Sequence, residues 1–167
     1  MKTIKLTIFI LISNLLIGQI PNNGFETWIS MPGYSTPVDW DNLNQVTYYK
    51  NVFTCNQGTP GNPGASYLFL ISKNVQGKGV VPGRAVSGKI DTTSYKPISG
   101  YSFINRPQQL NYFMQYMPYD PSDSVSVSVL LTKWDNTTLT RDTVAYGVSY
   151  YNAMAHTSVS YTHLRAH

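Results

Sequence analysis

The chain has few charged residues and no long apolar run. Asp, Glu, Lys and Arg make up 12% of its 167 residues, which is about half the usual share in a globular domain. The basic residues are scattered singly, whereas nucleic-acid binding needs them clustered on one face. The apolar stretch over residues 8–17 is shorter than the about 20 residues that a transmembrane helix needs. We therefore expect neither a nucleic-acid partner nor a transmembrane segment.

Cysteine and glutamate occur once each, as Cys55 and Glu26. We expect Cys55 to be a buried free thiol, or to have a partner in sequence missing from this chain. Glycoside hydrolysis normally uses two carboxylates, and the aspartates here fall mostly in turns. A Ser-His-Asp site would depend on His156 near the end of the chain, and no nucleophile-elbow, phosphate-loop or zinc-ligand spacing occurs. The sequence therefore offers no catalytic residue.

The two ends carry their own signals. Lys2 and Lys5 precede the apolar run, and small and polar residues follow it, which is the order of a secretory signal peptide over residues 1–19. We therefore expect a secreted or cell-surface protein. The last residues, VSYTHLRAH, resemble translated sequencing-adapter DNA. This resemblance predicts that residues 158–167 are non-native and that the final strands of the domain are missing.

Alternation of apolar and polar residues is the main structural pattern. In residues 124–134, valines and Leu131 alternate with serines and threonine, which is the period of a strand with one face in the core. Turn formers follow, and residues 139–151 alternate again, so the two segments predict an antiparallel hairpin. The sequence also contains thirteen tyrosines, and aromatic residues pack well on a pleated sheet.

Shorter segments extend the all-β pattern over residues 20–157, which we interpret as one domain. The segments rich in glycine and proline, residues 57–64 and 77–83, predict loops. Short strands separated by turns indicate an all-β sandwich or barrel. Besides the hairpin, the predicted strands are residues 46–53, 65–72, 85–90 and 110–117.

Three stretches together resemble a known family, and the third of them has two parts. They read IPNNGFETW, VPGRAVSGKI, GYSFINRPQQLNYFMQYMP and DSVSVSVLLTKWDNTTLTRDTVAYG, at residues 20–28, 81–90, 100–118 and 123–147. They are similar to the carbohydrate metabolism domain of exported proteins that often carry a type IX secretion tail. The resemblance implies a jelly-roll-like antiparallel β-sandwich of the carbohydrate-binding-module kind. It supplies no catalytic residue to carry over.

Sugar recognition needs flat aromatic faces together with planar polar groups. By strand parity Trp134 lies on the polar face of its strand, where it forms either a stacking platform or a plug at the end of the sandwich. Arg106 and the neighbouring Asn105 are candidates for polar contacts with sugar hydroxyls. The alternative for Arg106 is a salt bridge to Asp120 or Asp123.

A second group of aromatic residues follows in the chain. Phe113 and Tyr116 cannot both point inward on one strand, so we expect at least one aromatic side chain near the surface. The group either binds sugar or packs in the core or an interface. Its members are Tyr112, Phe113, Tyr116 and Tyr119.

Three expectations concern the N-terminal third. Asp39 and Asp41 offer oxygen ligands for calcium, although a solvated turn explains the same residues without a metal. Trp28 is expected in the core, and Trp40 is expected to be half-buried beside these aspartates.

These patterns predict a secreted, non-catalytic carbohydrate-binding or surface-adhesion module whose partner is a glycan or cell-surface polysaccharide. The alternative is a structural or protein-interaction domain of an exported multidomain protein. A glycoside hydrolase-associated enzyme domain is the third hypothesis.

Overall fold

Two long strands, β12 (Val125–Asp135) and β13 (Thr140–Tyr151), form an antiparallel hairpin with Val125 opposite Tyr151. On the inner face, Val127, Val129 and Leu131 of β12 lie opposite small residues of β13, of which Ala145 and Ser149 are buried. On the outer face, the serines of β12 are exposed. The alternation predicted over residues 124–151 is thus confirmed, and its cause is the period of two along a strand.

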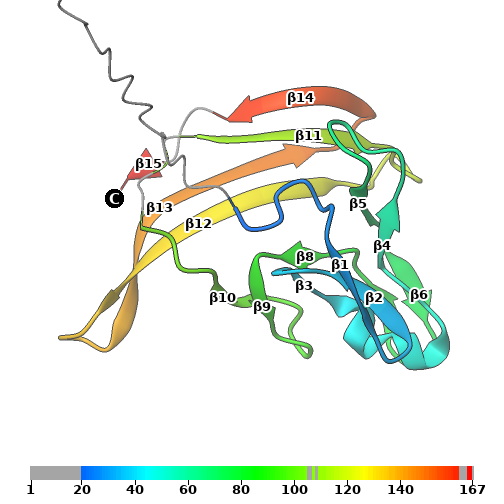
Figure 1. Ribbon diagram of the computed structural model, residues 1–167, viewed down its shortest axis with the longest axis horizontal. Helices are drawn as coiled ribbons and strands as arrows, with labels where there is room; N and C mark the ends of the chain where they lie inside the picture. Colours follow the sequence, from blue (N-terminus) through cyan, green and yellow to red (C-terminus); the bar gives the residue numbers. More distant parts are fainter. Residues whose placement is uncertain (1–19, 105–106, 108, 162–164, 167) are drawn as a thin grey trace, which may run out of the picture.

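A second long strand pair completes this half of the molecule. Strand β11 (Leu110–Tyr116) pairs with β14 (Ala155–Tyr161) over seven positions, and β15 (Arg165–Ala166) pairs with β13. The hydroxyl groups of Tyr112 on β11 and Tyr151 on β13 lie 2.8 Å apart and join the two long pairs. In Figure 1 these long strands form the upper layer, and short hairpins form the lower part.

The computed structural model describes residues 20–104, 107, 109–161 and 165–166, with side chains as far as Met154. The predicted signal peptide, residues 1–19, lies outside the described residues. The remaining elements are β1 (Trp28–Met31), β2 (Tyr34–Pro37), β3 (Asp41–Asn42), η1 (Leu43–Val46), η2 (Tyr48–Lys50), β4 (Cys55–Gly58), β5 (Tyr67–Leu70), β6 (Lys73–Val75), β7 (Gly79–Val81), β8 (Ala85–Val86), β9 (Gly88–Ile90) and β10 (Pro97–Gly100).

The short strands pair antiparallel, mostly with a neighbour in sequence: β1 with β2, β4 with β5, β6 with β7, and β9 with β10. The exception, β3 with β8, brings Asp41 opposite Val86. A small apolar core made by Leu43, Val75, Val81 and Ile90 lies among them. The structure therefore confirms an all-β fold of antiparallel strands, which is compatible with the predicted β-sandwich.

The strand predicted over residues 46–53 is wrong, because this region forms the 3₁₀ turns η1 and η2. The side chain of Asn42 caps η1 by accepting a hydrogen bond from the backbone N–H of Asn44 at 2.9 Å. Thr47 is buried, and its hydroxyl donates to the carbonyl of Leu43. Such local side-chain bonds compete with sheet pairing. The loop predicted over residues 77–83 is too long, since it contains β7.

The N-terminal tryptophans are both half-buried. The indole N–H of Trp28 donates to the carbonyl of Phe25 at 2.6 Å, and that of Trp40 donates to the carbonyl of Pro21 at 2.9 Å. The expectation for Trp40 is confirmed. The expectation that Trp28 packs in the core is wrong, because its side chain is only half-buried and its indole N–H is bound to a nearby backbone carbonyl.

Candidate functional site

The outer face of the β12–β13 hairpin carries three exposed aromatic side chains. Trp134 is 48% exposed, Tyr146 is 43% exposed and Tyr150 is 73% exposed. Tyr146 lies opposite Leu130, and Tyr150 lies opposite Ser126. Positions 126, 130 and 134 share one strand face, so the three rings project from the same side of the sheet. We call Trp134, Tyr146 and Tyr150 the aromatic track.

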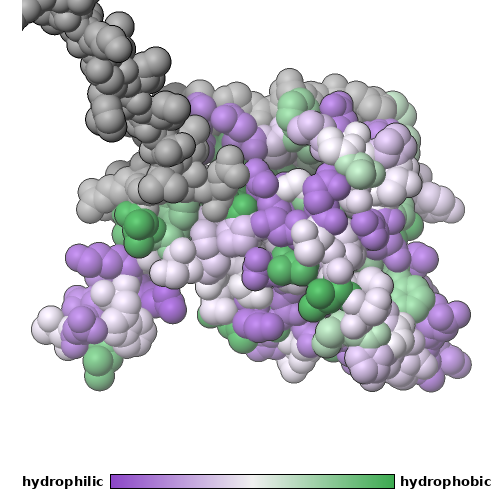
Figure 2. All heavy atoms as spheres, viewed as in Figure 1, coloured by the Kyte–Doolittle hydropathy of each residue, from purple (hydrophilic) through white to green (hydrophobic). Residues whose placement is uncertain are grey.

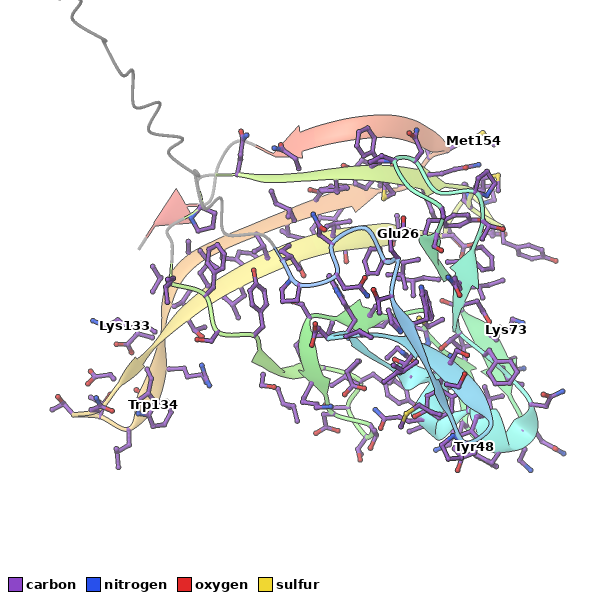
Figure 3. The ribbon with its side chains drawn as sticks, viewed as in Figure 1. Glu26, Tyr48, Lys73, Lys133, Trp134 and Met154 are labelled. Atoms are coloured by element: carbon purple, nitrogen blue, oxygen red, sulfur yellow. The ribbon has the colours of Figure 1, made fainter. Side chains whose placement is uncertain are left out.

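The register fixes the spacing along the aromatic track. Successive rings lie at levels four residues apart, which corresponds to about 14 Å at the rise of an antiparallel strand. A β-bulge between Leu131 and Thr132 separates the level of Tyr146 from that of Trp134, and such a bulge locally increases the twist. Figure 3 shows Trp134 near the free end of the hairpin, and Figure 2 shows this end standing clear of the rest of the molecule.

Arg141 accompanies Trp134 across the hairpin. Its guanidinium carbon lies 5.9 Å from the centroid of the Trp134 ring, and Nη1 donates to the hydroxyl of Thr132 at 3.4 Å. The cation–π contact is worth about 0.5–1 kcal/mol at an exposed site. It orients the indole and places guanidinium N–H donors beside it. The sequence patterns did not identify Arg141 as a candidate, although the hairpin register pairs it with Trp134.

The predicted aromatic cluster of β11 divides between the two faces of that strand. Tyr112 and Tyr116 are half-buried, whereas Phe113 is 62% exposed and Tyr119 lies fully exposed in the following turn. The expectation that at least one of these aromatics reaches the surface is confirmed. Burial and the neighbouring Asp123 raise the pKa of the Tyr116 phenol.

The predicted binding residues do not form one site. The backbone N–H of Tyr119 donates to Asp123 at 3.0 Å, which places Tyr119 beside the start of β12. Trp134 lies nine residues beyond Val125 on that strand, or about 30 Å away. Trp134 and Tyr119 are thus at opposite ends of the hairpin. Asn105 and Arg106 lie outside the described residues.

The two aspartates proposed for calcium differ in their surroundings. Asp39 is exposed, with a positive φ of 65°. The Asp41 carboxylate accepts hydrogen bonds from the backbone N–H groups of Asn42 and Ile90, both at 3.1 Å. In the described part of the chain, no group of three His, Cys, Asp or Glu side chains is arranged to hold a metal ion. Calcium binding at this turn stays a prediction.

Glu26, the single glutamate, braces a loop. Its carboxylate accepts hydrogen bonds from the backbone N–H groups of Ala65 at 3.0 Å and Ser66 at 3.2 Å. Gly64 has a φ of +105°, and a Cβ at this position would collide with the Glu26 carboxylate. The carboxylate therefore holds two distant segments together.

None of the helical turns among the described residues has the length or apolar character needed to cross a membrane. The resemblance to the carbohydrate metabolism domain stays a prediction. A comparison of this chain with family models, curated proteins and solved structures found no match.

Proposed function

We propose that this protein is an exported, non-catalytic module that binds a glycan or cell-surface polysaccharide through the aromatic track. The observation that carries the proposal is the alignment of three exposed rings on one face of a long hairpin. Aromatic faces pack against the apolar side of a pyranose ring, and a hydrogen-bonded sheet holds them in place without further ordering.

The dimensions and polarity of the track favour an extended polymer as the ligand. Three levels about 14 Å apart span about 27 Å, which is longer than one sugar unit. Hydroxyl side chains share this face: Ser126 lies opposite Tyr150, and Ser128 and Thr132 lie between the ring levels. Arg141 adds a planar fork of donors beside Trp134, and such a fork suits paired acceptor oxygens.

The proposal is tested with a panel of soluble polysaccharides and the single variants Trp134→Ala, Tyr146→Ala and Tyr150→Ala. Each lost ring is expected to weaken binding about tenfold, since aromatic contacts contribute about 0.5–1.5 kcal/mol beyond their buried area. Tyr49→Ala is the matched control, because Tyr49 is 55% exposed on η2, away from the hairpin. Circular dichroism verifies the fold of every variant. Binding that survives all three track substitutions contradicts the proposal.

A protein-interaction domain is the second candidate, and the apolar side chains of the long strands favour it. Leu130 is 58% exposed on the outer face of β12, and Phe113 is 62% exposed on β11. A docked protein would cover side chains of this kind, and charge-poor aromatic surface is typical of interface cores. In that case Leu130→Ser removes partner binding, whereas the polysaccharide panel gives no signal with the unmodified chain.

A further inference from the structure

A hollow between β2, η1 and β4 forms a separate candidate site. Its volume is about 330 Å³, which is at the small end of the range for ligand pockets. It lies among the short strands and not on the β12–β13 hairpin. The lining residues are Tyr34, Ser35, Asn44, Phe53, Cys55, Asn56 and Gln57.

The floor of this hollow is fixed by Asn44, which is buried. Its Oδ1 accepts from the backbone N–H groups of Thr54 at 2.8 Å and Cys55 at 3.1 Å. Its Nδ2 donates to the carbonyl of Cys55 at 2.6 Å. These bonds tie η1 to β4, so the hollow exists before any ligand arrives, and a preformed site avoids part of the ordering cost of binding.

The walls supply aromatic surface. Tyr34 and Phe53 are both half-buried. The Tyr34 ring packs against Tyr48, with the ring centroids 5.3 Å apart, and Tyr48 is labelled in Figure 3. Burial, Asp41 and Tyr48 each raise the pKa of the Tyr34 phenol, so its hydroxyl stays protonated and can donate a hydrogen bond.

Uncharged polar groups complete the lining. No hydrogen bond within the described residues engages the side-chain amide of Asn56. The Nε2 of Gln57 donates to the hydroxyl of Ser66 at 2.7 Å, which leaves its Oε1 as an acceptor. None of the lining residues carries a charge. The site therefore offers hydrogen-bond donors and acceptors to a ligand without charge.

We infer that this hollow binds a single neutral sugar unit, with its apolar face against Tyr34 or Phe53 and its hydroxyl groups on Asn56 and Gln57. Its uncharged lining offers no opposite charge to an ion, and its volume suits a single sugar unit. The inference concerns a second site and does not depend on the aromatic track.

The test uses the full chain and neutral monosaccharides (glucose, galactose and N-acetylglucosamine), with binding followed by saturation-transfer NMR. At least one sugar is expected to bind saturably with millimolar affinity. Asn56→Leu is expected to weaken this binding roughly tenfold, because leucine offers no hydrogen-bonding group to the sugar hydroxyl that Asn56 binds. Asn152→Leu, at an exposed position after β13, is the matched control and leaves binding unchanged.

Three outcomes overturn the inference. The first is that no neutral monosaccharide binds the folded chain, and the second is that Trp134→Ala abolishes binding whereas Asn56→Leu does not. The third is that the charged sugar glucuronate binds more tightly than glucose. The two sites are distinguished by the track variants. If these variants lose polysaccharide binding but still bind monosaccharides, the hollow acts independently of the aromatic track.

Discussion

Asn44→Ala is expected to destabilise the protein strongly, although Asn44 lies in a short 3₁₀ turn. The substitution leaves the buried backbone N–H groups of Thr54 and Cys55 without their acceptor, and it removes the donor to the Cys55 carbonyl. A buried polar group that loses its partner costs about 1–3 kcal/mol. Because the three groups share one site and relax together, we expect a total of about 4 kcal/mol.

The assay is thermal unfolding followed by circular dichroism. In a protein of this size each 1 kcal/mol lowers the melting temperature by about 2–4 °C, so Asn44→Ala is expected to melt about 8–16 °C below the unmodified chain. Asn56→Ala is the control, since Asn56 is on the adjoining strand β4 and its side-chain amide makes no hydrogen bond within the described residues. It is expected to change stability by less than about 0.5 kcal/mol. Equal melting temperatures for the two variants refute the reasoning.

Two further predictions concern titratable groups. Burial raises the pKa of the Cys55 thiol to about 12, so iodoacetamide at pH 8 should label Cys55 only after denaturation; rapid labelling of the native chain would contradict this. The backbone N–H groups of Ser94 and Thr93 lower the pKa of Asp91, so its contribution to stability is present at neutral pH and is lost as pH falls through this lowered pKa. Asp91→Ala is therefore expected to lower the melting temperature at pH 7, and this difference is expected to shrink as the pH falls through the lowered pKa. A pH-independent difference would show that the carboxylate charge is not involved.

The hairpin and the strand face of Trp134 follow from the sequence alone, because strand parity needs no information about other segments. Parity also places Tyr146 and Tyr150 on one face of β13. It does not say which face is buried, because both faces carry apolar residues. The structure resolves this choice, since Ala145 and Ser149 are buried and lie opposite Leu131 and Val127 of β12.

The region around η1 was not predictable in the same way. Residues 46–53 alternate well enough for a strand, but Asn42 and Thr47 satisfy the backbone of this segment locally. The sequence did not predict the hollow, for a related reason. Its lining comes from three segments that are joined by the side chain of Asn44, and nothing in the local sequence shows which backbone groups an asparagine will bind.

The two faces of β13 place different limits on how this chain can vary. Opposite Val127, Val129 and Leu131, the inner positions hold Ser149, Gly147 and Ala145. A larger residue at any of these positions would overpack the inner face of the hairpin, and overpacking costs about 1–3 kcal/mol. On the outer face no such volume limit applies. A lineage that changes its partner is therefore free to exchange the outward tyrosines, provided that the inward residues stay small.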